Sequence, residues 1–93
     1  MSKKLIDFAR NFIASNIDAD EFADPYIAMW KAERNARQLT IDGPDVDEAS
    51  SSLFCLADNY NPDVRREEYE LDDNALRTGV KATLEKFNLL HNV

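Results

Sequence analysis

The chain has little of what disulfide-bonded, phosphate-binding and membrane-spanning proteins require. It contains one cysteine, one histidine, two glycines and three prolines. A single cysteine excludes an internal disulfide and is typical of a reducing compartment, and so few glycines cannot form a phosphate-binding loop. No apolar run reaches the roughly 18 residues of a membrane span, and no small-residue cleavage site follows the basic N-terminus. We therefore expect a cytoplasmic protein with no membrane-spanning segment.

The scarcity of glycine and proline also argues against a fold of many strands, because tight turns need these residues. Apolar residues make up 44% of the chain and aromatic residues 10%, which argues against disorder despite 31% charged residues. A chain of 93 residues is long enough for one modest hydrophobic core. We expect residues 1–93 to form a single domain.

The charge of the chain is concentrated in one segment. Residues 40–73 hold eleven acidic residues against two arginines, a net charge of −9, whereas the remaining residues carry a net charge of +2. Such a polarised field repels nucleic acid and accelerates the encounter with a basic protein. We therefore expect a basic protein partner and no direct binding of nucleic acid.

Apolar residues recur at the spacing of one helical face in four segments: residues 3–15, about 26–37, about 46–60 and about 72–88. Gly43 and Pro44 end the loop that we expect from Leu39. Four amphipathic helices with short connections predict an all-α fold, an antiparallel four-helix bundle. One connection is not short: we expect a long acidic loop over residues 61–71, between the third and fourth helices.

Capping signals precede two of these helices. Asp18 and Glu21 have the spacing of a capping box, in which each side chain accepts a hydrogen bond from the backbone of the other residue. This pair predicts a helix start before residue 26. Asp45 and Glu48 repeat the spacing and predict that the third helix begins near residue 46.

Three residues inside the expected helices have specific consequences. Pro25 either kinks a helix that began after Asp18 or begins a second helix with Asp24 as its cap. Cys55 lies between two apolar residues, a setting typical of a small core residue. Gly79 favours a close approach between two helices.

Residues 58–74, DNYNPDVRREEYELDDN, are too polar for a core and too acidic for an ordinary connection. A solvated loop and a binding surface fit this composition about equally well. Two tyrosines lie among the carboxylates, and such rings add contact area at low entropic cost. Seven residues of this segment are acidic: Asp58, Asp63, Glu67, Glu68, Glu70, Asp72 and Asp73.

The sequence offers almost no catalytic chemistry. It has no HExxH motif and no local signature of a Ser/His/Asp triad, and its one histidine, His91, lies near the C-terminus. Asp42, Asp45 and Asp47 lack the glycine and the final glutamate of a calcium loop. We predict no catalytic residue, no cofactor and no metal site, and interpret the chain as a non-enzymatic helical domain that presents acidic residues to a basic protein.

Residues 61–87 resemble the colicin D-type immunity proteins. The family's pattern of Pro-Asp, a basic residue, Tyr-Glu, an aliphatic residue, Asp-Asp-Asn and a leucine falls on Pro62-Asp63, Arg66, Tyr69-Glu70, Leu71, Asp72-Asp73-Asn74 and Leu76. Residues 5–22, LIDFARNFIASNIDADEF, match less strongly, and the two stretches together cover about half of the chain.

This resemblance implies a helical immunity protein in the bacterial cytoplasm. Such a protein binds the basic C-terminal nuclease domain of a bacteriocin or of a toxin delivered by contact-dependent growth inhibition, with an expected stoichiometry of one to one. In the colicin D type the toxin is a tRNA-cleaving ribonuclease, and acidic residues of the immunity protein stand in for the RNA phosphates. A phosphate-binding cleft needs cationic side chains, and carboxylates form charge-assisted hydrogen bonds with them.

By position, Asp58 and Asp63 match acidic places of the family at the end of the third helix and the start of the loop. We hypothesise that these two face the catalytic cleft and that three further acids widen the contact. From the residues themselves, Asp72 or Asp73 is interpreted as the cap of the fourth helix and Arg66 as a tether to a carboxylate within the loop, while Tyr69 either packs the loop down or meets the partner. The predicted partner-binding residues are Asp58, Tyr60, Asp63, Glu67, Glu68, Tyr69 and Glu70.

Two other functions fit the same composition. A general acidic adaptor, or a nucleic-acid mimic with no dedicated toxin, would bind several basic partners with a strong salt dependence. A small acidic enzyme or metal protein would need a pocket containing carboxylates with perturbed pKa values.

Overall fold

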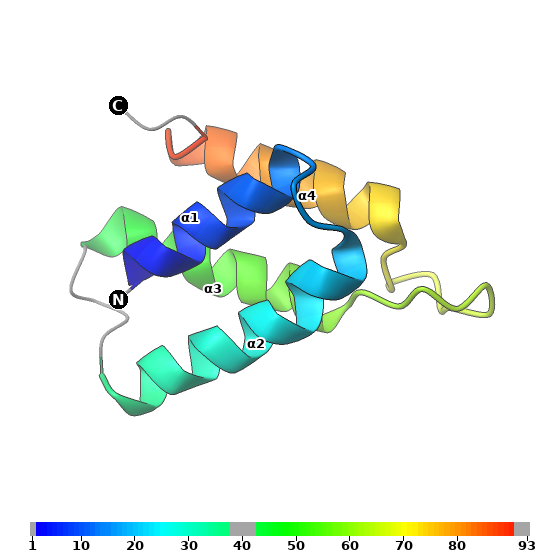
Figure 1. Cartoon of the computed structure of the whole chain (residues 1–93), viewed down its shortest axis with the longest axis horizontal. Helices are drawn as coiled ribbons and strands as arrows, with labels where there is room; N and C mark the ends of the chain where they lie inside the picture. The colour runs from blue at the N-terminus through cyan, green and yellow to red at the C-terminus, as the bar shows by residue number, and fades with distance from the viewer. Residues whose placement is uncertain (1, 38–42, 91–93) are drawn as a thin grey trace.

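The computed structural model describes residues 2–37 and 43–90. These residues form four helices, α1 (Ser2–Ile13), α2 (Ala19–Asn35), α3 (Pro44–Asp58) and α4 (Asp73–Lys86), and contain no strand. In Figure 1, α1 and α3 lie between α2 and α4, and every pair of helices is in contact. The all-helical prediction is confirmed. Within the described ranges no helix has the length and apolar character required to cross a membrane.

The start of α2 confirms the predicted capping box. Asp18 Oδ1 accepts a hydrogen bond from the Glu21 backbone N–H at 2.8 Å, and Glu21 Oε1 accepts one from the Asp18 N–H at 3.2 Å. The predicted cap of α4 is also confirmed, because Asp72 Oδ1 accepts from the Ala75 N–H at 2.8 Å. Both helices therefore begin at positions that local sequence alone identifies.

The predicted start of α3 is wrong. The helix begins at Pro44, its N-cap is Gly43 with φ of 99°, and no side chain caps it. Glycine adopts this left-handed backbone without strain, and proline favours the first helical position because it has no N–H to satisfy. Asp45 and Glu48 therefore lie inside the helix rather than forming a capping box. The rest of the expected loop, including Asp42, and His91 lie outside the described residues.

Helix α2 continues through Pro25 without a second start at Asp24. An interior proline removes one backbone hydrogen bond and costs about 3 kcal/mol when nothing compensates. Here Pro25 is exposed, while Phe22, Ala23 and Tyr26, its near neighbours along the helix, are buried. Burial of these neighbours on both sides of Pro25 offsets the lost hydrogen bond and keeps one helix.

The core is centred on a stack of aromatic rings. The Phe22 ring lies 4.5 Å from Phe12, 5.2 Å from Tyr26 and 5.5 Å from Phe8, measured between centroids. The buried Tyr26 hydroxyl donates to the Ser50 carbonyl at 2.7 Å, which ties α2 to α3. The buried hydrophobic residues are Leu5, Ile6, Ala9, Phe12, Ala19, Phe22, Ala23, Tyr26, Ala49, Leu53, Ala57, Leu76, Val80 and Leu84.

Two predictions about single residues of α3 and α4 have opposite outcomes. The close approach at Gly79 is confirmed, because a Cβ atom there would lie 3.1 Å from a Leu56 methyl carbon. The placement of Cys55 in the core is wrong, because its side chain is exposed. Leu53 and Ala57 face the core, and at about 100° per residue Cys55 lies on the opposite side of the helix.

Two arginines join the ends of α1 and α4. Arg77 of α4 donates a hydrogen bond to the Phe12 carbonyl in the last turn of α1, and its guanidinium carbon lies 4.2 Å from the centroid of the Phe12 ring. Arg10 of α1 donates from Nε to the carbonyl of Leu89, just beyond α4, at 2.7 Å. Each arginine satisfies a carbonyl at or beyond the end of the other helix, where intrahelical donors are absent.

We expect Arg77→Met to lower the free energy of unfolding by about 1.5–3 kcal/mol, the usual contribution of a hydrogen bond that involves a charged group. Methionine keeps most of the packing volume over Phe12 but removes the donor together with the positive charge, which also contacts the Phe12 ring and lies 3.6 Å from Asp73. Lys81→Met, one turn further along α4 at an exposed position, is the matched control and should stay close to the wild type. Urea denaturation measures both, and equal stabilities for the two variants would contradict the assignment.

Candidate functional site

The seven predicted partner-binding residues lie at the end of α3 and in the connection from Asn59 to Asp72. Figure 1 shows this connection projecting beyond the ends of the helices that it joins. Its two ends are held together by backbone hydrogen bonds. The Asn61 N–H donates to the Leu71 carbonyl, and the Leu71 N–H donates to the Asn59 carbonyl, both at 2.8 Å. The connection is therefore closed at its base, where Tyr60 and Leu71 form an isolated bridge.

Two successive β-turns form the projecting part. The first, Asp63–Arg66, is closed by the Arg66 N–H donating to the Asp63 carbonyl at 3.2 Å. The second, Glu67–Glu70, is closed in the same way at 3.0 Å. Asp63 Oδ1 also accepts from the Arg65 N–H at 2.9 Å, the local bond for which aspartate is favoured at the first position of a turn.

Glu70 braces the connection from inside. Its carboxylate accepts from Asn61 Nδ2 at 3.2 and 3.3 Å and from the Glu67 N–H at 2.8 Å. Arg66 Nε donates to the Asn61 carbonyl at 2.9 Å. Arg66 is thus the predicted internal tether, but the prediction of a carboxylate acceptor is wrong, because its acceptor is the backbone carbonyl of Asn61 at the base of the connection.

Asp63 is partly engaged by its neighbour. Arg65 Nη2 lies 3.3 Å from Asp63 Oδ2 in an exposed ion pair. The hydrogen bond from the Arg65 backbone, followed by that from its side chain, lowers the pKa of Asp63 because both favour the carboxylate. Asp63 is therefore ionised at neutral pH, and Arg65 offsets part of its charge.

Tyr60 is tied to α2. Its hydroxyl donates to Asp20 Oδ1 at 2.6 Å. Partial burial raises the pKa of Tyr60 well above its ordinary range, and the hydrogen bond and negative charge of Asp20 raise it further, with smaller effects of Asp73 and Asp18. The structure therefore brings acids from the starts of α2 and α4 beside the connection.

The other three predicted carboxylates and one tyrosine face solvent. Asp58, Glu67, Glu68 and Tyr69 are exposed, and within the described residues their side chains form no hydrogen bond or ion pair. Tyr69 is 70% exposed. Of the seven predicted residues, Tyr60 and Glu70 are thus held by internal hydrogen bonds. Asp63 is exposed but also bonded to Arg65, and the other four are available to bind a partner.

Sequence reasoning missed two residues at this site. Val64 lies in the first β-turn and is 88% exposed, more than Tyr69 at 70%. A β-branched apolar residue between Asp63 and Arg65 was the available signal. The other is Asp20, whose proximity to Tyr60 depends on tertiary structure, although the run DADEFAD at residues 18–24 already showed a second concentration of acids.

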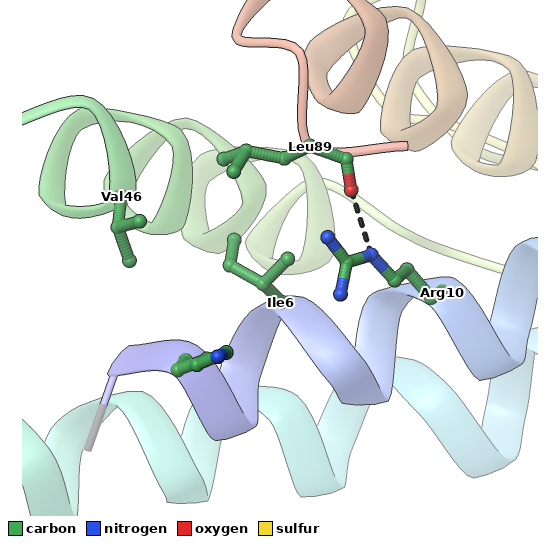
Figure 2. A pocket seen from close by; sticks show the side chains of 5 residues that line it. Ile6, Arg10, Val46 and Leu89 are labelled. Atoms are coloured by element: carbon green, nitrogen blue, oxygen red, sulfur yellow. Dashed lines mark hydrogen bonds between the residues drawn. The ribbon is translucent and has the colours of Figure 1, made fainter. Parts of the chain in front are cut away.

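A pocket elsewhere on the molecule offers no comparable group of acids. It has a volume of about 260 Å³ and lies between α1, the first turn of α3 and the residues after α4. Figure 2 shows Arg10 at its edge, bonded to the Leu89 carbonyl. The charged lining residues are Lys3 and Arg10, so the pocket contains no acid–base pair. The described ranges also contain no group of three or more His, Cys, Asp or Glu residues arranged to hold a metal ion.

These features define a small helical protein with exposed carboxylates on a hydrogen-bonded connection. Residues 1–87 match the model of a family described as bacterial self-protective colicin-like immunity. Since the match covers most of the chain, the chain belongs to this family of immunity proteins. Membership implies a bacteriocin-type immunity protein that binds a cognate toxin, and members are generally not enzymes. No curated protein matches the chain.

We expect Tyr60→Phe to reduce the loss of stability at alkaline pH. Folding raises the pKa of Tyr60. Its contribution to the free energy of unfolding is therefore complete below the pKa of the unfolded chain, about 10, and is lost as the pH rises towards the pKa of the folded protein. The pKa of buried Tyr26 is also raised, so the free energy of unfolding of the variant still falls with rising pH, but less steeply. Urea denaturation between pH 9 and 11 tests this, and equal slopes for variant and wild type would contradict it.

We expect Glu70→Ala to loosen the second β-turn, whereas Glu68→Ala should leave it unchanged. Both variants remove one carboxylate, but only Glu70 accepts hydrogen bonds within the connection. Amide hydrogen exchange of Glu67, whose N–H bonds to Glu70, should accelerate in Glu70→Ala alone. Similar exchange in the two variants would show that Glu70 does not brace the turn.

Proposed function

We propose that this chain is a colicin D-type immunity protein that inhibits a toxin nuclease by covering its basic active-site cleft. The toxin domain is a ribonuclease that cleaves tRNA and is delivered as part of a bacteriocin or by cell contact. The immunity protein binds it one to one in the cytoplasm. The observation that carries the proposal is the set of free carboxylates, Asp58, Glu67 and Glu68, at a hydrogen-bonded connection in a chain of the colicin-like immunity family.

The chemistry of a ribonuclease cleft supports this choice of partner. Such a cleft binds phosphates through lysine, arginine or histidine, and these side chains need anionic partners once water is excluded. Exposed carboxylates satisfy them through charge-assisted hydrogen bonds. The net charge of −9 over residues 40–73 also accelerates the encounter with a basic domain.

The predicted residues divide into two roles under this proposal. Asp58, Glu67 and Glu68 meet cationic groups of the toxin directly, because no hydrogen bond or ion pair from the described residues 2–37 and 43–90 competes for them. Asp63 contributes charge while it shapes the first turn, and Glu70 acts by holding the second turn in place.

The arrangement of the helices belongs to the same proposal. We infer one domain over residues 1–93, an antiparallel four-helix bundle that carries the acidic loop between α3 and α4. The short connection from α1 to α2 supports this inference, because short connections join antiparallel neighbours. Contact between every pair of helices also supports it.

A protection assay tests the function directly. The C-terminal domain of the protein encoded by the adjacent upstream gene is expressed with and without this chain. We expect growth arrest with cleaved tRNA in unprotected cells, and rescue with a one-to-one complex on gel filtration. Asp58→Lys with Glu68→Lys should abolish rescue, because two like charges would face the cationic cleft, at a loss of several kcal/mol in binding.

Glu48→Lys with Glu85→Lys is the matched control for this charge reversal. It reverses two charges at exposed positions, Glu48 on α3, about 15 Å from Asp58 along the helix, and Glu85 near the end of α4. It should protect like the wild type. Full protection by Asp58→Lys with Glu68→Lys would contradict the acidic contact. A toxin domain without toxicity and without a complex would instead favour a general acidic adaptor or nucleic-acid mimic, which binds several basic proteins and releases them in moderate salt.

A further inference from the structure

We propose that Val64 and Tyr69 are paired apolar anchors that enter a nonpolar recess beside the cationic cleft of the toxin domain and make the complex specific and slow to dissociate. This inference rests on the proposed function and adds the chemistry of the partner's surface. It requires a toxin domain whose basic cleft borders an uncharged, aliphatic or aromatic depression.

The exposure of the two side chains is the first observation. Val64 is 88% and Tyr69 70% exposed, and they are the exposed large hydrophobic residues of the described chain. Both lie in the same short connection, one in each of its two β-turns, while the large apolar residues of the helices pack in or against the core. Water leaves both side chains when a complementary surface covers them, which favours association.

The hydrogen bonds that close their two turns are the second observation. Val64 is the second residue of the turn Asp63–Arg66, and Tyr69 is the third residue of the turn Glu67–Glu70. Side chains of Asn61 and Glu70 join the base of the connection to the second turn. Little conformational entropy is therefore lost on binding, and such preorganisation strengthens a contact without adding area.

The free carboxylates are close to these anchors along the chain, at positions where they can supply the charged rim of an interface. Glu67 and Glu68 lie in the same turn as Tyr69, and Asp58 lies at the end of α3 from which the connection departs. An apolar centre with a polar rim is the usual arrangement of a specific protein interface. Charge complementarity selects a basic partner and raises the association rate, whereas the desolvated centre controls the dissociation rate.

The need for discrimination explains why carboxylates alone would be insufficient. Every nuclease that binds RNA presents cationic groups, so acidic residues attract many basic proteins without choosing one. Two apolar side chains at fixed positions fit only a surface with matching depressions, and a charged surface at those positions would be left desolvated and unpaired.

Binding kinetics with the C-terminal domain of the adjacent upstream gene product separate the two contributions. We expect Val64→Ser with Tyr69→Ser to raise the dissociation rate at least about tenfold, with the association rate and its salt dependence unchanged. Glu67→Gln with Glu68→Gln should instead lower the association rate and weaken its salt dependence. Tyr69→Phe keeps the ring and should dissociate like the wild type.

Ala82→Ser, at an exposed position of α4, is the control for adding a hydroxyl to the surface. Melting temperatures close to that of the wild type establish that all variants are folded. A serine double variant that dissociates at the wild-type rate, while the glutamine variant is impaired, would overturn the anchors and leave the proposed function intact. A wild-type protein that does not bind this domain would overturn both.

Discussion

The packing of Phe22 against three other rings is the contact on which the rest of the structure depends. Its neighbours on α1 and α2 fix the angle between these helices, and the buried hydroxyl of Tyr26 extends the contact to the backbone of α3. Burial of this stack also keeps α2 continuous through Pro25. Because α1 is held in turn to α4 by Arg10 and Arg77, one aromatic cluster and two arginines position all four helices.

This core decides the geometry of the acidic connection. The end of α3 and the start of α4 are placed by buried residues of both helices, and two backbone hydrogen bonds then join the ends of the connection. Within it, the turns are held partly by side chains that composition alone identifies only as acidic or polar. Glu70 and Asp63 accept internal hydrogen bonds, which leaves Glu67 and Glu68 facing solvent. Some carboxylates of this acidic segment thus accept internal hydrogen bonds, and these bonds hold its shape.

The acidic connection can be interpreted from what membership of the colicin-like immunity family requires of the protein. An inhibitor that must protect its own cell has to find its toxin quickly and hold it for long periods. We attribute the first requirement to the carboxylates, because their field acts over a distance of about a Debye length, roughly 8 Å at physiological salt. We attribute the second to Val64 and Tyr69, because apolar contacts act only after water has been expelled. The two kinds of residue lie in the same connection, so encounter and retention would involve one surface.

The sequence by itself determined the helical class, the caps at Asp18 and Asp72, and the position of the acidic segment, because helical periodicity and capping depend on residues a few positions apart. Local pattern failed at Cys55. Its two apolar neighbours predicted a core residue, but the side chain points away from the core on α3 and is exposed. Only the tertiary structure decided which acids are free and which are bonded. Tyr60 meets Asp20 from forty residues away, and no local rule connects positions so distant. The family follows from the sequence match, but the division of the carboxylates between bracing and exposure is set by the folded turns, since each hydrogen bond depends on where the backbone places its donor.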